Sequence, residues 1–136
     1  MAPGKFITFF YAILDARERR LTYENAGHCA ELPIKSTGQT EQMQGQGGVL
    51  GVESKWTYVD FSLEISTGDR LPLFTDGVTE AASQKEVEFG YEGITNAAGT
   101  ATSSAVELKG RIMKEVADFC RGEFRDDVTL VVACIR

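Results

Sequence analysis

Hydrophobic and polar residues alternate in several short segments of the first half of the chain, which predicts β-strands. Residues 5–14 (KFITFFYAIL) are apolar on both faces, as is typical of a central strand covered on both sides. Residues 21–25 (LTYEN) predict a second strand, antiparallel to the first across the polar turn 15–20. Residues 56–65 (WTYVDFSLEI) alternate again, and an apolar strand over 70–75 follows them. The first half is therefore predicted to form a run of antiparallel strands.

The second half of the chain has helical periodicity. From residue 103 onward apolar residues recur every three or four positions, with charged residues on the opposite side. A capping box begins at Ser104, and Gly122 stands where a C-terminal capping glycine belongs, so a helix is predicted between them. Residues 89–98 predict a shorter helix, and the apolar segment 127–135 predicts a final strand. This order predicts an α+β fold with helices covering a mostly antiparallel sheet.

The composition is typical of one globular domain and narrows the possible functions. A chain of 136 residues with 43% hydrophobic and 25% charged residues predicts a single domain spanning residues 1–136. The formal charge of −6 opposes non-specific nucleic-acid binding, which depends on basic residues. The 3 cysteines are widely spaced and predict free thiols in a reducing, cytoplasmic location. No apolar run is long enough to span a membrane, so no membrane partner is expected.

Two apolar strands carry aspartates at their loop ends. Asp76 follows the strand 70–75, and Asp126-Asp127 stand at the N-terminal start of the strand 127–135. If the strands are antiparallel neighbours, three carboxylates converge at one sheet edge, where divalent cations would find oxygen ligands. Two such ions can activate water and hold a phosphoryl group. A turn at Asp76 and a polar strand start at Asp126-Asp127 explain the same residues without an ion, so spacing alone leaves both interpretations open.

Six segments match one known family in order and spacing. They are FITFFYAILD (6–15), LTYENAGH (21–28), GGVLGV (47–52), TGDRLPLFTDGVTEA (67–81), EFGYEGI (88–94) and FRDDVTLVV (124–132). Together they resemble the catalytic domain of the PP2C-like (PPM) bacterial serine/threonine phosphatases, in the SpoIIE/RsbU branch. The resemblance covers nearly the whole chain. It implies a sandwich of antiparallel β-sheets flanked by helices, with a two-metal centre of Mn²⁺ or Mg²⁺ at one end.

The resemblance also implies roles for individual residues. Asp76 and Asp126 match the family's metal ligands. Asp127 matches the position after the second ligand, where it is expected to support the ligands without binding the metal or to begin the strand. Gly77 is expected to let the backbone pass close to the metals. Glu80 stands where some relatives place an acidic residue near an accessory metal. The alternative for Glu80 is an exposed acid favoured by the dipole at a helix start.

Three features need separate interpretation. His28, after Asn-Ala-Gly, is either a general acid or phosphate contact, or a residue that orders a turn. Pro72 removes a backbone donor from the strand 70–75, which predicts a frayed or edge-placed strand. The family's early Gly-Asp motif, whose aspartate bridges the two metals, has no counterpart, because the first aspartate is Asp15 in a predicted turn. The domain is therefore expected to be N-terminally incomplete, with an exposed sheet edge that favours homodimers.

The leading prediction is a phosphatase domain acting on phosphoserine or phosphothreonine of a regulatory protein. The resemblance implies an anti-sigma-factor antagonist as the substrate and direct attack by activated water. Because the bridging aspartate has no counterpart, the chain is expected to show little activity alone, whether as a fragment, a mis-started frame or a pseudophosphatase. The alternative is a non-catalytic module that binds the signalling partner. A PAS-like sensor domain is a third possibility, but it leaves Asp126-Asp127 and the NAGH segment unexplained.

Overall fold

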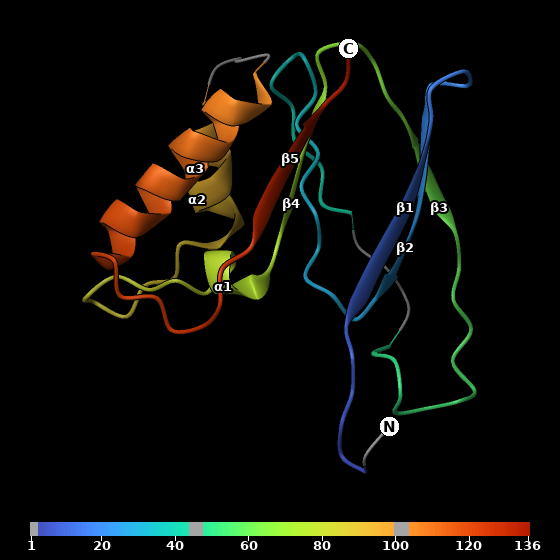
Figure 1. Cartoon of the computed structure of the whole chain (residues 1–136), viewed down its shortest axis with the longest axis horizontal. Helices are drawn as coiled ribbons and strands as arrows, with labels where there is room; N and C mark the ends of the chain where they lie inside the picture. Colours follow the sequence, from blue (N-terminus) through green and yellow to red (C-terminus); the bar gives the residue numbers. More distant parts are fainter. Residues whose placement is uncertain (1–2, 44–47, 100–103) are drawn as a thin grey trace. The chain divides into compact units, whose positions relative to one another are not determined.

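The computed structural model describes residues 3–43, 48–99 and 104–136 (Figure 1). The chain divides into two compact units, each with its own sheet. The first unit comprises Met1–Ala30 and Met43–Ser66, and the second comprises Glu31–Gln42 and Thr67–Arg136. The matched segment at 47–52 lies partly outside the described residues. No helix among the described residues is long and apolar enough to cross a membrane.

The first unit contains a three-stranded antiparallel sheet in the order β1-β2-β3. The strands are β1 (Phe9–Asp15), β2 (Arg20–Ala26) and β3 (Phe61–Glu64). The predicted antiparallel pairing across a polar turn is confirmed for β1 and β2. The third strand is shorter than predicted, because only residues 61–64 pair with β2.

The turn and the strands of this sheet are each held by local contacts. The carboxylate of Asp15 closes the turn after β1 by accepting a hydrogen bond from the backbone N–H of Glu18 at 2.9 Å. The rings of Phe10, Tyr23 and Phe61 stack across the three strands, with centroid distances of 5.8 and 5.6 Å. One face of the sheet is therefore an aromatic ladder.

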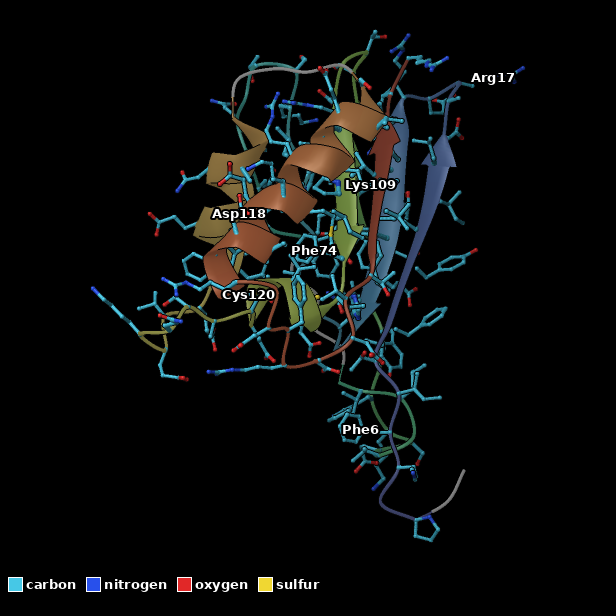
Figure 2. All side chains as sticks on the ribbon, turned by 60° about the vertical axis from the view of Figure 1, so that its left-hand side comes forward. Phe6, Arg17, Phe74, Lys109, Asp118 and Cys120 are labelled. Carbon is cyan, nitrogen blue, oxygen red and sulfur yellow. The ribbon has the colours of Figure 1, made fainter. Side chains whose placement is uncertain are left out.

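The prediction that residues 5–14 form a central strand covered on both sides is wrong. In the described residues β1 lies at an edge of its sheet. Phe9, Tyr11 and Ile13 share one face, where they remain 49%, 53% and 54% exposed. Phe6, in the segment before β1, is also exposed (Figure 2). Apolar residues on both faces of a strand indicate that both faces can be covered, not that a covering layer is present.

The second unit contains a two-stranded antiparallel sheet of β4 (Arg70–Phe74) and β5 (Leu130–Cys134). The connection between the two strands contains α1 (Asp76–Thr79), α2 (Gly90–Ala98) and α3 (Ala105–Cys120). Helices α2 and α3 lie against each other beside this sheet (Figure 1). The core of this unit includes four fully buried aliphatic side chains, those of Ile94, Leu108, Ile112 and Val116.

The ends of α3 follow the predicted capping pattern. The Ser104 hydroxyl accepts a hydrogen bond from the backbone N–H of Glu107 at 3.3 Å. At the other end Arg121 and Gly122 both have positive φ, 53° and 73°, and the N–H of Gly122 donates to the carbonyl of Ala117 at 2.9 Å. The helix therefore ends where the sequence predicts, although a non-glycine residue enters the left-handed region first.

Pro72 leaves the pairing of β4 with β5 intact. It lies opposite Val132 in a continuous register. The N–H of Thr75 donates toward β5, to the carbonyl of Thr129 at 3.1 Å, whereas the N–H of Arg70 donates to the carbonyl of Ile34 at 2.9 Å. Because N–H directions alternate along a strand, the donor that Pro72 lacks would point away from β5. The predicted fraying is wrong, and the predicted edge placement is confirmed.

Candidate metal centre at the end of the β4–β5 sheet

The antiparallel pairing of β4 with β5 brings the segment after β4 beside the segment before β5. Asp76 begins α1 directly after β4, and Asp126 precedes β5. Thr75 fixes this junction with its main chain and its side chain. Its N–H donates to the Thr129 carbonyl, and its hydroxyl accepts from the Thr129 N–H, both at 3.1 Å. The structure thus has the strand arrangement on which the convergence of these aspartates depends.

Gly77 allows a close approach between α1 and the segment before β5. A Cβ atom at Gly77 would lie 2.1 Å from the backbone oxygen of Asp127, closer than any side chain could tolerate. The Thr75 hydroxyl also donates to that oxygen, at 3.4 Å. The glycine was predicted to let the backbone pass close to metals. In the structure its close neighbour is the Asp127 main chain, so Gly77 sets how near the two aspartate-bearing segments come.

The aspartate carboxylates at this end of the sheet face solvent. Asp76, Asp126 and Asp127 are all exposed, and an oxygen of Asp126 accepts the N–H of Asp127 at 2.7 Å. Among the described residues the Asp76 carboxylate has no hydrogen-bond or ion-pair partner. The Asp76 carbonyl accepts the N–H of Glu80 at 2.8 Å and the hydroxyl of Thr79 at 3.2 Å. The backbone of α1 is therefore fixed while the Asp76 carboxylate stays available for a ligand.

The carboxylates at this corner have the ligand chemistry of a divalent-cation site. Asp76 and Asp126 supply the hard oxygen atoms that Mg²⁺ and Mn²⁺ prefer. The neighbouring cation Arg125 is already engaged by Glu86 in an ion pair. Across the part of the chain that is described, neither aspartate belongs to a group of three His, Cys, Asp or Glu residues with ligand atoms within 4.8 Å of one another. Water would have to complete the coordination of an ion held here.

Glu80 and His28 occupy different settings. Glu80 is the exposed residue that caps the C-terminus of α1, so it is not at a helix start as the alternative interpretation assumed. His28 belongs to the first unit, where its N–H donates to the side-chain oxygen of Asn25 at 2.8 Å. Its Nδ1 lies 3.3 Å from the hydroxyl of Thr8. These contacts are those of a residue that orders a turn.

Glu31 is a notable acidic residue that the sequence analysis missed. Its side chain is only 2% exposed, and Oε2 accepts the backbone N–H of Phe74 at 3.0 Å. Burial raises the pKa of the Glu31 carboxyl to about 8, against the opposing effect of the Phe74 hydrogen bond. A single carboxylate inside the apolar segment 30–34 was the signal that could have identified it.

Solved structures define the class of this fold, which is that of PP2C phosphatase domains. The PP2C domain of SpoIIE from Bacillus subtilis, solved with a fragment of its regulatory domain, matches with a TM-score of 0.82 and 23% identity, over 94% of this chain and 37% of that chain. The SpoIIE phosphatase domain presoaked with Mn matches with a TM-score of 0.75 and 22% identity, over 94% of this chain and 56% of that chain. The SiaA-PP2C domain of Pseudomonas aeruginosa matches with a TM-score of 0.79 and 16% identity, over 95% of this chain and 52% of that chain. The predicted fold class is confirmed.

Sequence comparison then identifies the family. The model of the stage II sporulation protein E (SpoIIE) family matches residues 1–136, and the chain belongs to this family. Protein IcfG of Synechocystis sp. is 29% identical over 127 residues, and phosphoserine phosphatase RsbU of Bacillus subtilis is 29% identical over 128 residues. Each match covers 93% of this chain, which spans 20% of the length of IcfG and 38% of that of RsbU.

Proposed function

We propose that this chain is part of a metal-dependent phosphatase domain that removes phosphate from serine or threonine of a regulatory protein. The observation that carries the proposal is the register of β4 with β5, which presents Asp76 and Asp126 at one end of a sheet. Membership of the SpoIIE family supports it, as do the name of RsbU and the Mn-presoaked SpoIIE structure. The substrate class we propose is a phosphorylated anti-sigma-factor antagonist, met in the cytoplasm.

In this function the residues of the chain bind and position. Asp76 and Asp126 would hold Mn²⁺ or Mg²⁺, and Gly77 and Thr75 keep the two ligand-bearing segments together. The ion, when bound, supplies a Lewis acid that neutralises phosphate charge and lowers the pKa of water. The exposed carboxylates of Asp127 and Glu80 add negative charge that attracts the cation and would repel a phosphoprotein while no ion is present.

A second candidate function is a non-catalytic module that binds the same phosphoprotein without turnover. The observation that favours it is that, in the described residues, neither Asp76 nor Asp126 belongs to a group of three His, Cys, Asp or Glu residues with ligand atoms within 4.8 Å of one another. One ion held by two aspartates cannot clamp both the attacking and leaving oxygens as a metal pair does. We therefore expect the 136-residue chain alone to show little phosphate release.

The metal assignment is tested by titrating Mn²⁺ into the purified chain and following heat. Asp76→Asn and Asp126→Asn should each weaken binding more than about tenfold, because each removes a charged ligand. Asp118→Asn is the matched control, since Asp118 is an exposed acid on α3 paired with Lys114 at 2.7 Å. Binding that is absent, or equally affected by all three changes, would overturn the metal site. Release of phosphate from a phosphoserine peptide, dependent on Mn²⁺ and on Asp76, would favour the enzyme over the non-catalytic module.

A further inference from the structure

The edge of β4 that faces away from β5 has an interrupted hydrogen-bond ladder. Ile34 and Arg70 form a closed pair there, with N–H to carbonyl distances of 2.8 and 2.9 Å. In an antiparallel ladder the next hydrogen-bonded pair along β4 lies two residues further on and would use the N–H of residue 72. That residue is Pro72, which has no N–H. The pairing of this edge therefore cannot continue in the usual way toward Asp76.

The N–H of Phe74 is the next donor on the same edge, and a side chain takes it. Phe74 is 2% exposed, so its amide would be costly to leave without an acceptor. Oε2 of Glu31 accepts it at 3.0 Å. The ring of Phe74 lies edge-on to Tyr91 of α2, with centroids 6.0 Å apart. The Glu31 carboxyl thus supplies the acceptor that strand pairing would otherwise supply.

Hydrogen bonds on both edges of β4 therefore hold the strand immediately before Asp76. On the edge facing β5, Thr75 exchanges hydrogen bonds with Thr129. On the opposite edge, Glu31 holds Phe74. We propose that Glu31 is a positioning residue, whose side chain fixes the end of β4 and thereby the direction in which Asp76 presents its carboxylate. This inference rests on the proposed metal-binding function of Asp76.

The test compares variants at position 31 in the complete 136-residue chain. Glu31→Leu keeps the volume but removes the acceptor, Glu31→Asp moves the acceptor back by one methylene, and Glu31→Gln keeps it. Two quantities are measured for each variant, the amide hydrogen exchange of Phe74 by NMR and the affinity for Mn²⁺ by calorimetry. In Glu31→Leu and Glu31→Asp, the protection of the Phe74 amide against exchange and the affinity for Mn²⁺ should each fall more than about tenfold. In Glu31→Gln both should stay within about threefold of the wild type. The rescue by Gln separates an acceptor role from simple packing.

The control is another buried carboxylate of the same unit. Asp69 is 5% exposed and accepts the N–H of Ser36 at 2.9 Å, at the opposite end of β4. Asp69→Asn should leave the Phe74 exchange rate and the Mn²⁺ affinity within about threefold of the wild type. Equal losses in Asp69→Asn and Glu31→Leu would show general destabilisation and overturn the proposal.

The remaining outcomes separate this proposal from the function on which it rests. Unchanged Phe74 protection and Mn²⁺ affinity in both Glu31→Leu and Glu31→Asp would overturn the positioning role. If Glu31→Leu does not fold, the comparison of Glu31→Asp with Glu31→Gln decides. If the wild type binds no Mn²⁺, the metal function fails. The positioning role is then decided by the amide chemical shifts of Gly77 and Val78, which should move in Glu31→Asp and stay in place in Glu31→Gln.

Discussion

The two sheets of this chain are both antiparallel, but their apolar residues are covered to different extents. The β4–β5 sheet lies beside α2 and α3 (Figure 1). Aliphatic side chains of these helices, such as that of Ile112, are completely buried. On the three-stranded sheet, Phe9, Tyr11 and Ile13 of β1 remain about half exposed. The aspartate-bearing sheet therefore has a core assembled within its own unit, whereas β1 carries an apolar face that a further layer or a second copy could cover.

The largest expected effect comes from the covered sheet. Ile112→Ala should lower the free energy of unfolding by about 3 kcal/mol, because it removes a side chain that is 0% exposed and leaves a cavity. Ile13→Ala should cost less than about 1 kcal/mol, since Ile13 is 54% exposed. Urea denaturation followed by circular dichroism measures both. Similar losses at the two positions would contradict the difference between the sheets.

A glycine comparison probes the candidate metal corner of the covered sheet. Gly77→Ala should destabilise by about 2 kcal/mol and weaken Mn²⁺ binding, because the new methyl group collides with the Asp127 backbone oxygen. Gly110→Ala is the control, as a Cβ there meets no atom within 4 Å and lies inside α3. It should stabilise by about 0.5–1 kcal/mol. Equal changes in stability and in Mn²⁺ affinity for the two variants would argue against a close approach between Gly77 and the Asp127 backbone.

The buried carboxyl of Glu31 predicts a pH dependence of stability. Its pKa is raised from 4.5 to about 8, so between these values the folded chain keeps a proton that the unfolded chain has lost. The stabilisation is complete below about pH 4.5, falls as the pH rises and is fully lost above about pH 8. Relative to Glu31→Gln, the wild type should lose about 1–3 kcal/mol between pH 5 and 8. Parallel stability curves for the two proteins over that range would show that Glu31 has an ordinary pKa.

The smallest effect on stability is expected at the exposed face of β1. Ile13→Lys should change the free energy of unfolding by less than about 0.5 kcal/mol. If the exposed edge of β1 forms homodimers, as the sequence leads us to expect, the same change should weaken them about tenfold by placing a charge on an edge strand. Sedimentation velocity measures the association. Val106→Lys is the control, because Val106 is 77% exposed but lies on α3. Equal weakening by both changes would indicate that charge alone, rather than the strand edge, controls association.

Local sequence signals predicted the covered unit well. The capping box at Ser104 and the spacing of Leu108, Ile112 and Val116 depend only on residues near in sequence, and α3 follows them. The pairing of β4 with β5 was a condition of the predicted metal site rather than a prediction, and the structure shows that pairing, with Asp76 after β4 and Asp126 before β5. The burial of β1 was not predictable, because an apolar pattern cannot show whether a neighbouring layer is present.

The candidate site was predicted only in part, for a related reason. Asp76 and Asp126 stand at strand ends and belong to recognisable motifs. Glu31 belongs to no motif, and its role depends on Pro72, a residue distant in sequence that interrupts the same edge of β4. The effect of Pro72 itself depended on which edge its missing N–H would face, and that direction is set by the register rather than by composition.

The connection between β4 and β5 contains α1, α2 and α3, so Asp76 and Asp126 mark the two ends of one long loop of chain. An ion bound by both would act as a reversible staple across that loop. Because the two ligands are held together only in the folded chain, the ion would stabilise the folded state by mass action and oppose the opening of α2 and α3. A chelator should therefore make α2 and α3 easier for a protease to cut, even without any substrate present.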